Sequence, residues 1–349
     1  MRRKGLNPAF AMIILVITLV LCVGTSFFIL NNQKANLAKL DSELPESAIS
    51  TYFKQIKNDD FDGIFENSLI IDPHLNSKEA YVEALKNIYK DVDVSKLGFV
   101  KDKANEDMYQ IVNGNVFVSN LKLIKSSDGK WLASTIFTGD NNYTIQVPQG
   151  VVLQINGNDL DDSYIIEKDV VANNFKGIPS GSVPFKVNTY EVKNLIKEPE
   201  ITIKGSGYAM VKDVLSNYYY VGKTPTGVDY ETIFASIGKS VARFPTKDGG
   251  LNEIPVITNS DFYSRIKTLN NQWYAANGTA EFSNVKVSDV VMQSDDTMIG
   301  NVTMDFLISS SNASKTYHIG YQMTLINDGG KWKIAGFGID NDLNPANKQ

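Results

Sequence analysis

The most constraining feature of this 349-residue chain is an uncharged apolar run near its N-terminus. No charged residue lies between Lys4 and Lys34, and residues 9–30 read AFAMIILVITLVLCVGTSFFIL. Because about 20 apolar residues in a helix span the hydrocarbon core of a bilayer, we expect 9–30 to be a transmembrane helix. Arg2 and Arg3 precede it, and a basic flank of this kind stays in the cytoplasm. The sequence therefore predicts a single-pass protein of the cell membrane, with a cytoplasmic stub at 1–8 and an extracellular C-terminal part.

Two processing signals compete with an uncleaved anchor. A signal-peptidase site needs small residues before the cut, and Val23 and Thr25 fit that pattern poorly. A lipoprotein site at Cys22 would need a small residue just before it, and Leu21 is not small. We therefore expect the anchor to remain uncleaved, with Cys22 inside the bilayer.

The composition of the remaining chain excludes several classes of function. On the C-terminal side of the predicted membrane segment, 31 basic residues stand against 39 acidic ones, which argues against a nucleic-acid binder because such a protein shows a basic face. The single Cys cannot form an internal disulfide or a Cys-rich zinc site, and two His (His74 and His318) are too few for a His-rich metal centre. We expect no cofactor and no metal. An acidic exterior without disulfides suits the outer face of a bacterial cell with a single membrane.

After a polar spacer at 31–44, the segment 45–138 changes from helical to strand periodicity. Apolar residues recur at helical spacing after Pro45, a short helix follows at 61–65, and Asn76 with Glu79 predicts a capping box for a third helix. Alternating segments at 108–112 and 116–124 flank Asn113-Gly114, which predicts a hairpin. A last strand is expected from Lys130 to about Phe137.

The segment 206–342 repeats this order. The spacing of Met210, Val211, Val214, Leu215 and Tyr218 predicts a first helix, and further helices are expected at 230–237 and 262–269. Four strands are expected at 280–287, 298–308, 317–326 and 332–339. Asp128-Gly129-Lys130-Trp131 in the first copy matches Gly329-Gly330-Lys331-Trp332 in the second. The stretch 244–259 is expected to be an inserted loop.

Between the two copies, 139–205 is predicted to be a small all-β module. Strands are expected at 143–148, 151–155, 183–187 and 201–203, with a hairpin turn at Asn156-Gly157. The residues 204–207 are typical of a linker. The last residues, 343–349, are predicted to be a polar tail.

In each copy, the predicted order is helices, then an antiparallel sheet whose last strand begins with Lys-Trp. This order resembles the NTF2-like (cystatin-like α+β cone) superfamily over about 45–138 and 208–340. The whole layout resembles membrane-anchored envelope proteins of Gram-positive bacteria such as the teicoplanin-resistance-associated membrane protein family. The zinc ribbon common in that family needs paired Cys, which residues 1–8 do not contain. The resemblance implies an α+β fold with two cone domains separated by the β module.

Aromatic residues are the best sequence candidates for contact with a partner. Tyr218, Tyr219 and Tyr220 fall at the end of the first predicted helix of the second copy, and Trp273 and Tyr274 follow its third. Consecutive aromatics on a helix cannot all face one core, and exposed Tyr and Trp favour partner contact. The alternative is that they plug the open end of the cone.

The sequence favours a non-enzymatic envelope protein that binds or scaffolds a cell-wall polymer, a wall-synthesis enzyme or a further copy of itself. The alternative is a small-ligand carrier or an isomerase- or dehydratase-type enzyme with a pocket in one cone. Asp59, Asp60 and Asp62 lie beside the helix that would line such a pocket, but carboxylates in a turn usually cap a helix. We expect no catalytic residues.

Overall fold

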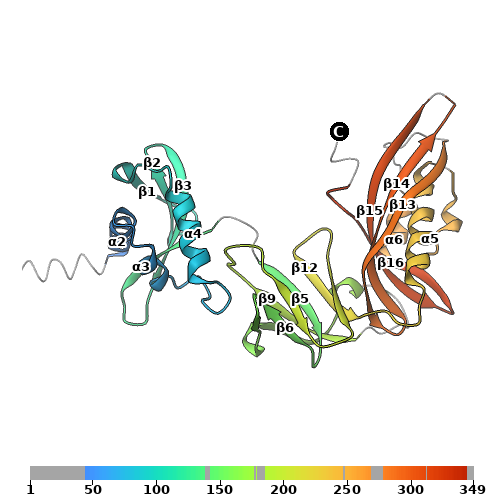
Figure 1. Ribbon diagram of the computed structural model, residues 1–349, viewed down its shortest axis with the longest axis horizontal. Coiled ribbons are helices and arrows are strands. Elements are labelled where there is room, and N and C mark those ends of the chain that lie inside the picture. Colours follow the sequence, from blue (N-terminus) through green and yellow to red (C-terminus); the bar gives the residue numbers. More distant parts are fainter. Residues whose placement is uncertain are drawn as a thin grey trace, which may run out of the picture. The chain divides into compact units, whose positions relative to one another are not determined.

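The computed structural model describes residues 44–137, 142–176, 178, 185–246, 248–268, 278–311 and 313–343. The chain divides into two compact units between Gly139 and Asp140. The described part is α+β, with most of its ordered elements in sheets and few helices (Figure 1). Within these ranges no helix is long and apolar enough to cross a membrane. The predicted anchor at 9–30 and the stub at 1–8 lie outside the described residues.

From residue 44 to residue 137, the first unit has three helices followed by one antiparallel sheet, in the predicted order. The helices are α2 (Pro45–Lys57), α3 (Phe61–Glu66) and α4 (Lys78–Tyr89). The sheet has the order β1-β2-β3-β4, formed by β1 (Leu97–Lys101), β2 (Met108–Asn113), β3 (Val116–Lys125) and β4 (Trp131–Ile136). Strand β1 was not predicted, because its residues are half-buried or exposed and show no alternation of buried and exposed positions.

Capping and turn residues explain where helix α4 begins and where strands β2 and β3 are joined. Helix α4 begins after Ser77, whose Oγ accepts a hydrogen bond from the Ala80 backbone N–H at 3.2 Å. The predicted cap at Asn76 is therefore wrong by one residue, and the Asn76 side chain donates instead to the Asp72 carbonyl. The Asn113-Gly114 hairpin is confirmed, with Gly114 at φ +63, a conformation that favours glycine.

Three tyrosines lie in the interior of the first unit between the helices and the sheet. The Tyr52 hydroxyl is hydrogen-bonded to Thr135 Oγ1 at 2.6 Å and to the Tyr89 hydroxyl at 3.1 Å. Tyr89 is in turn hydrogen-bonded to Ser119 Oγ at 3.1 Å. Burial raises the pKa of Tyr52, Tyr81 and Tyr89, because an ionised phenolate is poorly solvated in this interior.

The second unit is built around a large sheet. Its strand order is β16-β15-β14-β13-β12-β5-β9-β8, with β11 paired to β12, and a separate small sheet has the order β10-β6-β7. Helices α5 (Tyr230–Arg243) and α6 (Asp261–Ile266) come between β12 and β13. The strands are β5 (Tyr143–Pro148), β6 (Val152–Ile155), β7 (Asn158–Asp159), β8 (Ile165–Val171), β9 (Lys186–Val192), β10 (Ile201–Lys204), β11 (Tyr208–Lys212), β12 (Tyr218–Lys223), β13 (Thr279–Ser294), β14 (Thr297–Ser309), β15 (Ser314–Asp328) and β16 (Lys331–Ile339).

The predicted first helix of the second copy is wrong. Its residues form the hairpin of β11 and β12, in which Met210 pairs with Val221 and Val211 with Tyr220. Asp213 shapes the turn, because its Oδ1 accepts a hydrogen bond from the Leu215 backbone N–H at 2.8 Å. The apolar residues matched helical spacing only because they came from two strands and the turn between them.

The predicted β module and the predicted second cone share one sheet. Strand β5 pairs in parallel with β12, Tyr218 opposite Thr144 and Tyr220 opposite Gln146. The expected linker at 204–207 is a connection from β10 to β11 inside the same compact unit. A parallel pairing between segments more than 70 residues apart has no local sequence signal.

Helices α5 and α6 cover one face of the β13–β16 part of the sheet. Phe234 and Phe262 from the helices are buried with Val302 and Met323 from the strands. Gly238 permits this close packing, because a Cβ at that position would lie 2.9 Å from Val302 Cγ1. The hydrophobic core of the unit thus lies between α5, α6 and the four long strands.

Candidate binding site

Strand β13 of the second unit has a partly unpaired edge. Strand β13 pairs with β14 along one side. On the other side, the described strands pair with it only at Met292, opposite Lys223 of β12. From Glu281 to Val287 no described strand pairs with this side of β13, and such an edge carries unpaired backbone donors and acceptors. Farther along, Val291 lies in one buried cluster with Val211 of β11.

Two irregularities bend this edge. The pairing of β13 with β14 shifts between Ser283 and Lys286 and again between Ser288 and Val291. Each shift contains a residue with positive φ, Asn284 at +51 and Asp289 at +52. These are β-bulges, which increase the twist of a strand and redirect its side chains. They leave a short segment, 285–287, between two bends.

A depression of about 400 Å³ lies between this segment and helix α5. We call it the α5–β13 groove. Its floor is apolar, since Ala235, Val285 and Val287 line it, and the valines also pack against the core. The full lining is Glu231, Thr232, Ala235 and Lys239 from α5 with Val285, Lys286 and Val287 from β13.

The helical side of the groove follows from the sequence of α5. Glu231, Ala235 and Lys239 are four residues apart, so they form one stripe along the helix. The adjacent face, with Phe234 and Ile237, is buried in the core. The N-terminus of α5 is fixed by Asp229, whose Oδ1 accepts a hydrogen bond from the Thr232 backbone N–H at 3.1 Å.

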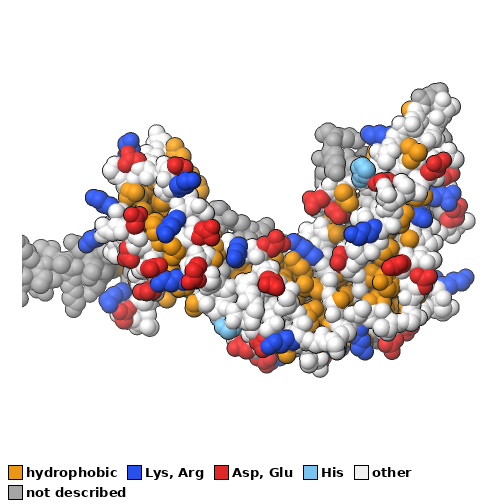
Figure 2. All heavy atoms as spheres, viewed as in Figure 1, with side chains coloured by type: hydrophobic (Ala, Val, Ile, Leu, Met, Phe, Trp, Pro, Cys, Tyr) orange, Lys and Arg blue, Asp and Glu red, His pale blue; other side chains and the backbone are white. Residues whose placement is uncertain are grey.

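Two lysines give the groove its charge. Lys239 is half-buried and Lys286 is exposed, and within the described residues neither forms an ion pair. Glu231 supplies the only acidic side chain of the lining. Figure 2 shows acidic and basic side chains interspersed over the visible surface. The groove differs from this mixed surface in two respects. Its floor is apolar, and its two lysines, Lys239 and Lys286, form no ion pair within the described residues.

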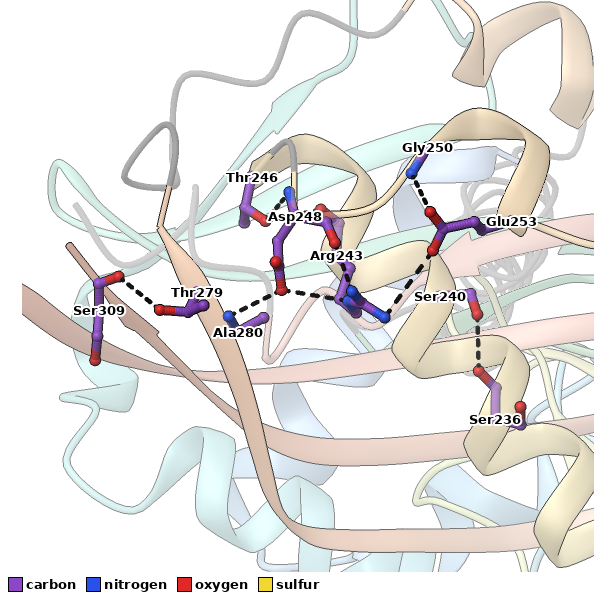
Figure 3. Close-up of polar contacts among 10 residues, drawn as sticks. All are labelled: Ser236, Ser240, Arg243, Thr246, Asp248, Gly250, Glu253, Thr279, Ala280 and Ser309. Carbon is purple, nitrogen blue, oxygen red and sulfur yellow. Dashed lines mark hydrogen bonds and ion pairs between the residues drawn. The ribbon is translucent and has the colours of Figure 1, made fainter.

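An arginine network joins the end of α5 to the beginning of β13 (Figure 3). Arg243 donates from Nε to Asp248 Oδ2 at 3.3 Å and from Nη2 to the Asp248 carbonyl at 2.6 Å. Asp248 Oδ2 also accepts a hydrogen bond from the Ala280 backbone N–H at 3.1 Å. Glu253 lies 4.0 Å from Arg243 Nη1 and accepts from the Gly250 backbone N–H. The predicted inserted loop therefore folds back to the beginning of β13, where its Asp248 holds the Ala280 N–H.

A second polar network holds the first bulge. The Asn284 side-chain amide donates to Asp305 Oδ2 at 2.6 Å, and Asp305 Oδ1 lies 2.5 Å from His318 Nδ1. The Asn284 amide and then His318 lower the pKa of Asp305. Asp305 and His318 face each other across β14 and β15, and the His318 side chain is 66% exposed. These hydrogen bonds hold the bulge at Asn284 against β14 and β15, beside the groove.

The aromatic residues singled out by sequence do not form this site. Tyr218, Tyr219 and Tyr220 lie on strand β12, and Tyr219 and Tyr220 are 8% and 3% exposed. Successive residues of a strand point to opposite faces, and both faces are covered here: Tyr218 packs on Tyr220, and Tyr219 packs on Tyr143. Burial raises the pKa of all three hydroxyls. The other two candidates, Trp273 and Tyr274, lie outside the described residues.

The acidic candidates of the first unit have local roles. Asp60 caps α3 by accepting a hydrogen bond from the Gly63 backbone N–H at 3.1 Å, as expected for a carboxylate in a turn. Asp62 lies 3.6 Å from Lys78, and Asp59 has a positive φ of 55 in the preceding turn. The described ranges contain no group of three or more His, Cys, Asp or Glu side chains placed to hold a metal ion.

Sequence reasoning missed the groove. Lys239 and Lys286 are unremarkable in the chain, and the bulges that expose 285–287 have only Asn284 and Asp289 as a local signal, since Asn and Asp adopt positive φ more readily than other residues. A search with protein-family models finds no match to this chain, and a search of curated proteins finds no similar sequence.

Proposed function

We propose that this chain is a membrane-anchored binding protein of a bacterial cell envelope, whose two folded units lie outside the cell and hold a partner. The apolar run at 9–30 and its basic flank support the anchor and its orientation. The acidic remainder of the chain and its lack of Cys support an envelope location.

Both units are proposed to be of the NTF2-like type. In the first unit, three helices precede a four-stranded antiparallel sheet. In the second, α5 and α6 pack on β13–β16. Large side chains fill both interiors, among them Tyr52 and Tyr81 in one and Phe234 and Phe306 in the other. This filling favours recognition at the surface over a ligand held inside a cone.

The α5–β13 groove is the observation that carries the binding role. It combines an apolar floor, an uncovered strand edge and two lysines without an ion pair, on elements that are themselves fixed by the core. Rigid elements that present a few polar groups around an apolar surface are the usual construction of a binding site.

The test is site-specific photo-crosslinking of the full chain in its native membrane. A photoreactive residue at Thr232 in the groove should give a defined adduct, identified by mass spectrometry. The same residue at the exposed Thr316 of β15 serves as the control and should not give it. No adduct at Thr232 would refute the binding role there. A covalently altered small-molecule product generated by the purified chain would favour an isomerase- or dehydratase-type enzyme instead.

A further inference from the structure

The edge of β13 is suited to pairing with another chain. From Glu281 to Val287, no described strand is paired with it, whereas Val291 lies in one buried cluster with Val211 of β11. The Ala280 N–H just before this stretch is already bonded to Asp248, so the Arg243 network sets where pairing can begin. The bulge at Asp289 and the pairing of Met292 with Lys223 set where it ends. The available length suits a short extended segment rather than a whole sheet.

Charged residues and bulges on an edge are also a known protection against unwanted pairing. Protection of the edge, however, does not explain why helix α5 lies beside it with an apolar depression between the helix and the strand. Here Ala235, Val285 and Val287 form such a floor, and Lys239 and Lys286 also line the groove. An extended peptide laid along a strand edge places alternate side chains on one face, so every second residue of an added segment would reach this floor.

We propose that the α5–β13 groove binds an extended acidic peptide segment of a partner protein by β-strand addition to the edge of β13. This inference rests on the proposed binding function and specifies the class of partner. Backbone hydrogen bonds to β13 hold the segment, small β-branched side chains contact the floor, and Asp or Glu side chains pair with Lys239 and Lys286. Glu231 at the start of α5 disfavours an acidic residue at that end and so orients the segment.

The experiment is selection of a phage-displayed library of random nine-residue segments on the full chain in lipid nanodiscs. We expect enrichment of segments that alternate Val, Ile or Thr with Asp or Glu. A fluorescent copy of the most enriched peptide is then titrated by anisotropy. Affinity should fall at least tenfold in the double variant K239E/K286E. The matched control K197E/K331E changes the same net charge at exposed lysines outside the groove and should bind as the wild type does.

A second probe separates strand addition from simple charge attraction. The same peptide with N-methyl groups on alternate backbone nitrogens keeps its charge but cannot form one set of ladder hydrogen bonds. It should bind at least tenfold more weakly. Equal binding of the methylated peptide, or no enrichment of acidic segments, overturns the inference. If the Thr232 adduct proves to be a wall polymer rather than a protein, strand addition is wrong while the binding function stands.

Discussion

At the scale of single residues, the buried tyrosines of the first unit offer a matched pair. The Tyr52 hydroxyl makes two hydrogen bonds, whereas the Tyr81 hydroxyl lies near Ser68 and Thr135 without a hydrogen-bond partner among the described residues. A buried group that loses its partner costs about 1–3 kcal/mol, whereas removing an unpaired hydroxyl is nearly neutral. We expect Y52F to lower the free energy of unfolding of the first unit by about that amount, and Y81F to change it little.

Urea unfolding of the full chain measures the free energy of unfolding of both variants. An equal loss in Y52F and Y81F would contradict the assignment of the two hydrogen bonds to Tyr52.

The hydrogen bonds of Asp305 predict that the thermal stability of the second unit depends on pH. A carboxyl whose folded pKa is lowered stabilises the fold above its ordinary pKa of about 3.9, and this contribution disappears as the pH falls through the lowered value. The D305N variant should therefore melt below the wild type at neutral pH, and the difference should shrink below about pH 4. Thermal unfolding from neutral to strongly acidic pH tests this. The control D295N removes the same charge from an exposed turn residue between β13 and β14; a pH-dependent gap of the same size in both variants would contradict a specific role for Asp305.

At the scale of elements, Gly222 decides whether β12 can lie beside β13. A Cβ there would lie 2.4 Å from the Met292 carbonyl oxygen, a backbone atom that cannot rotate away. Overpacking of this kind costs about 1–3 kcal/mol. We expect G222A to destabilise the second unit by that amount in denaturant unfolding. The strand glycine Gly98 is the comparison, since a Cβ there meets Val112 only at 3.6 Å, and G98A should leave the first unit intact. A wild-type midpoint for G222A would show that the two strands separate without loss.

At the scale of the whole molecule, the anchor makes a prediction independent of the groove. We expect the full chain to sediment with membranes and to resist carbonate extraction, because transfer of the apolar run at 9–30 into a bilayer is strongly favourable. Deletion of 9–30 should release the protein. Added protease should digest the C-terminal part from outside intact cells. Extraction of the full chain by carbonate would mean that the segment does not span the membrane.

The sequence by itself predicted features whose cause is local. Apolar spacing predicted helices where α2, α4 and α5 lie, although the predicted 230–237 is shorter than the observed Tyr230–Arg243. The hairpin turns at Asn113-Gly114 and Asn156-Gly157 follow from residues that adopt positive φ. The α+β class and the four long C-terminal strands followed from the change of period.

Only the tertiary structure decided where β11 and β12 belong and where the α5–β13 groove forms. The helical spacing at 210–218 was a coincidence across a turn, and the parallel pairing of β5 with β12 depends on contacts distant in sequence. The groove likewise joins Lys239 to Lys286 across 47 positions of the numbered chain. Local physics determines which segments become helices, strands and turns, whereas the competition among many distant packing partners determines which edge stays uncovered and which charges meet there.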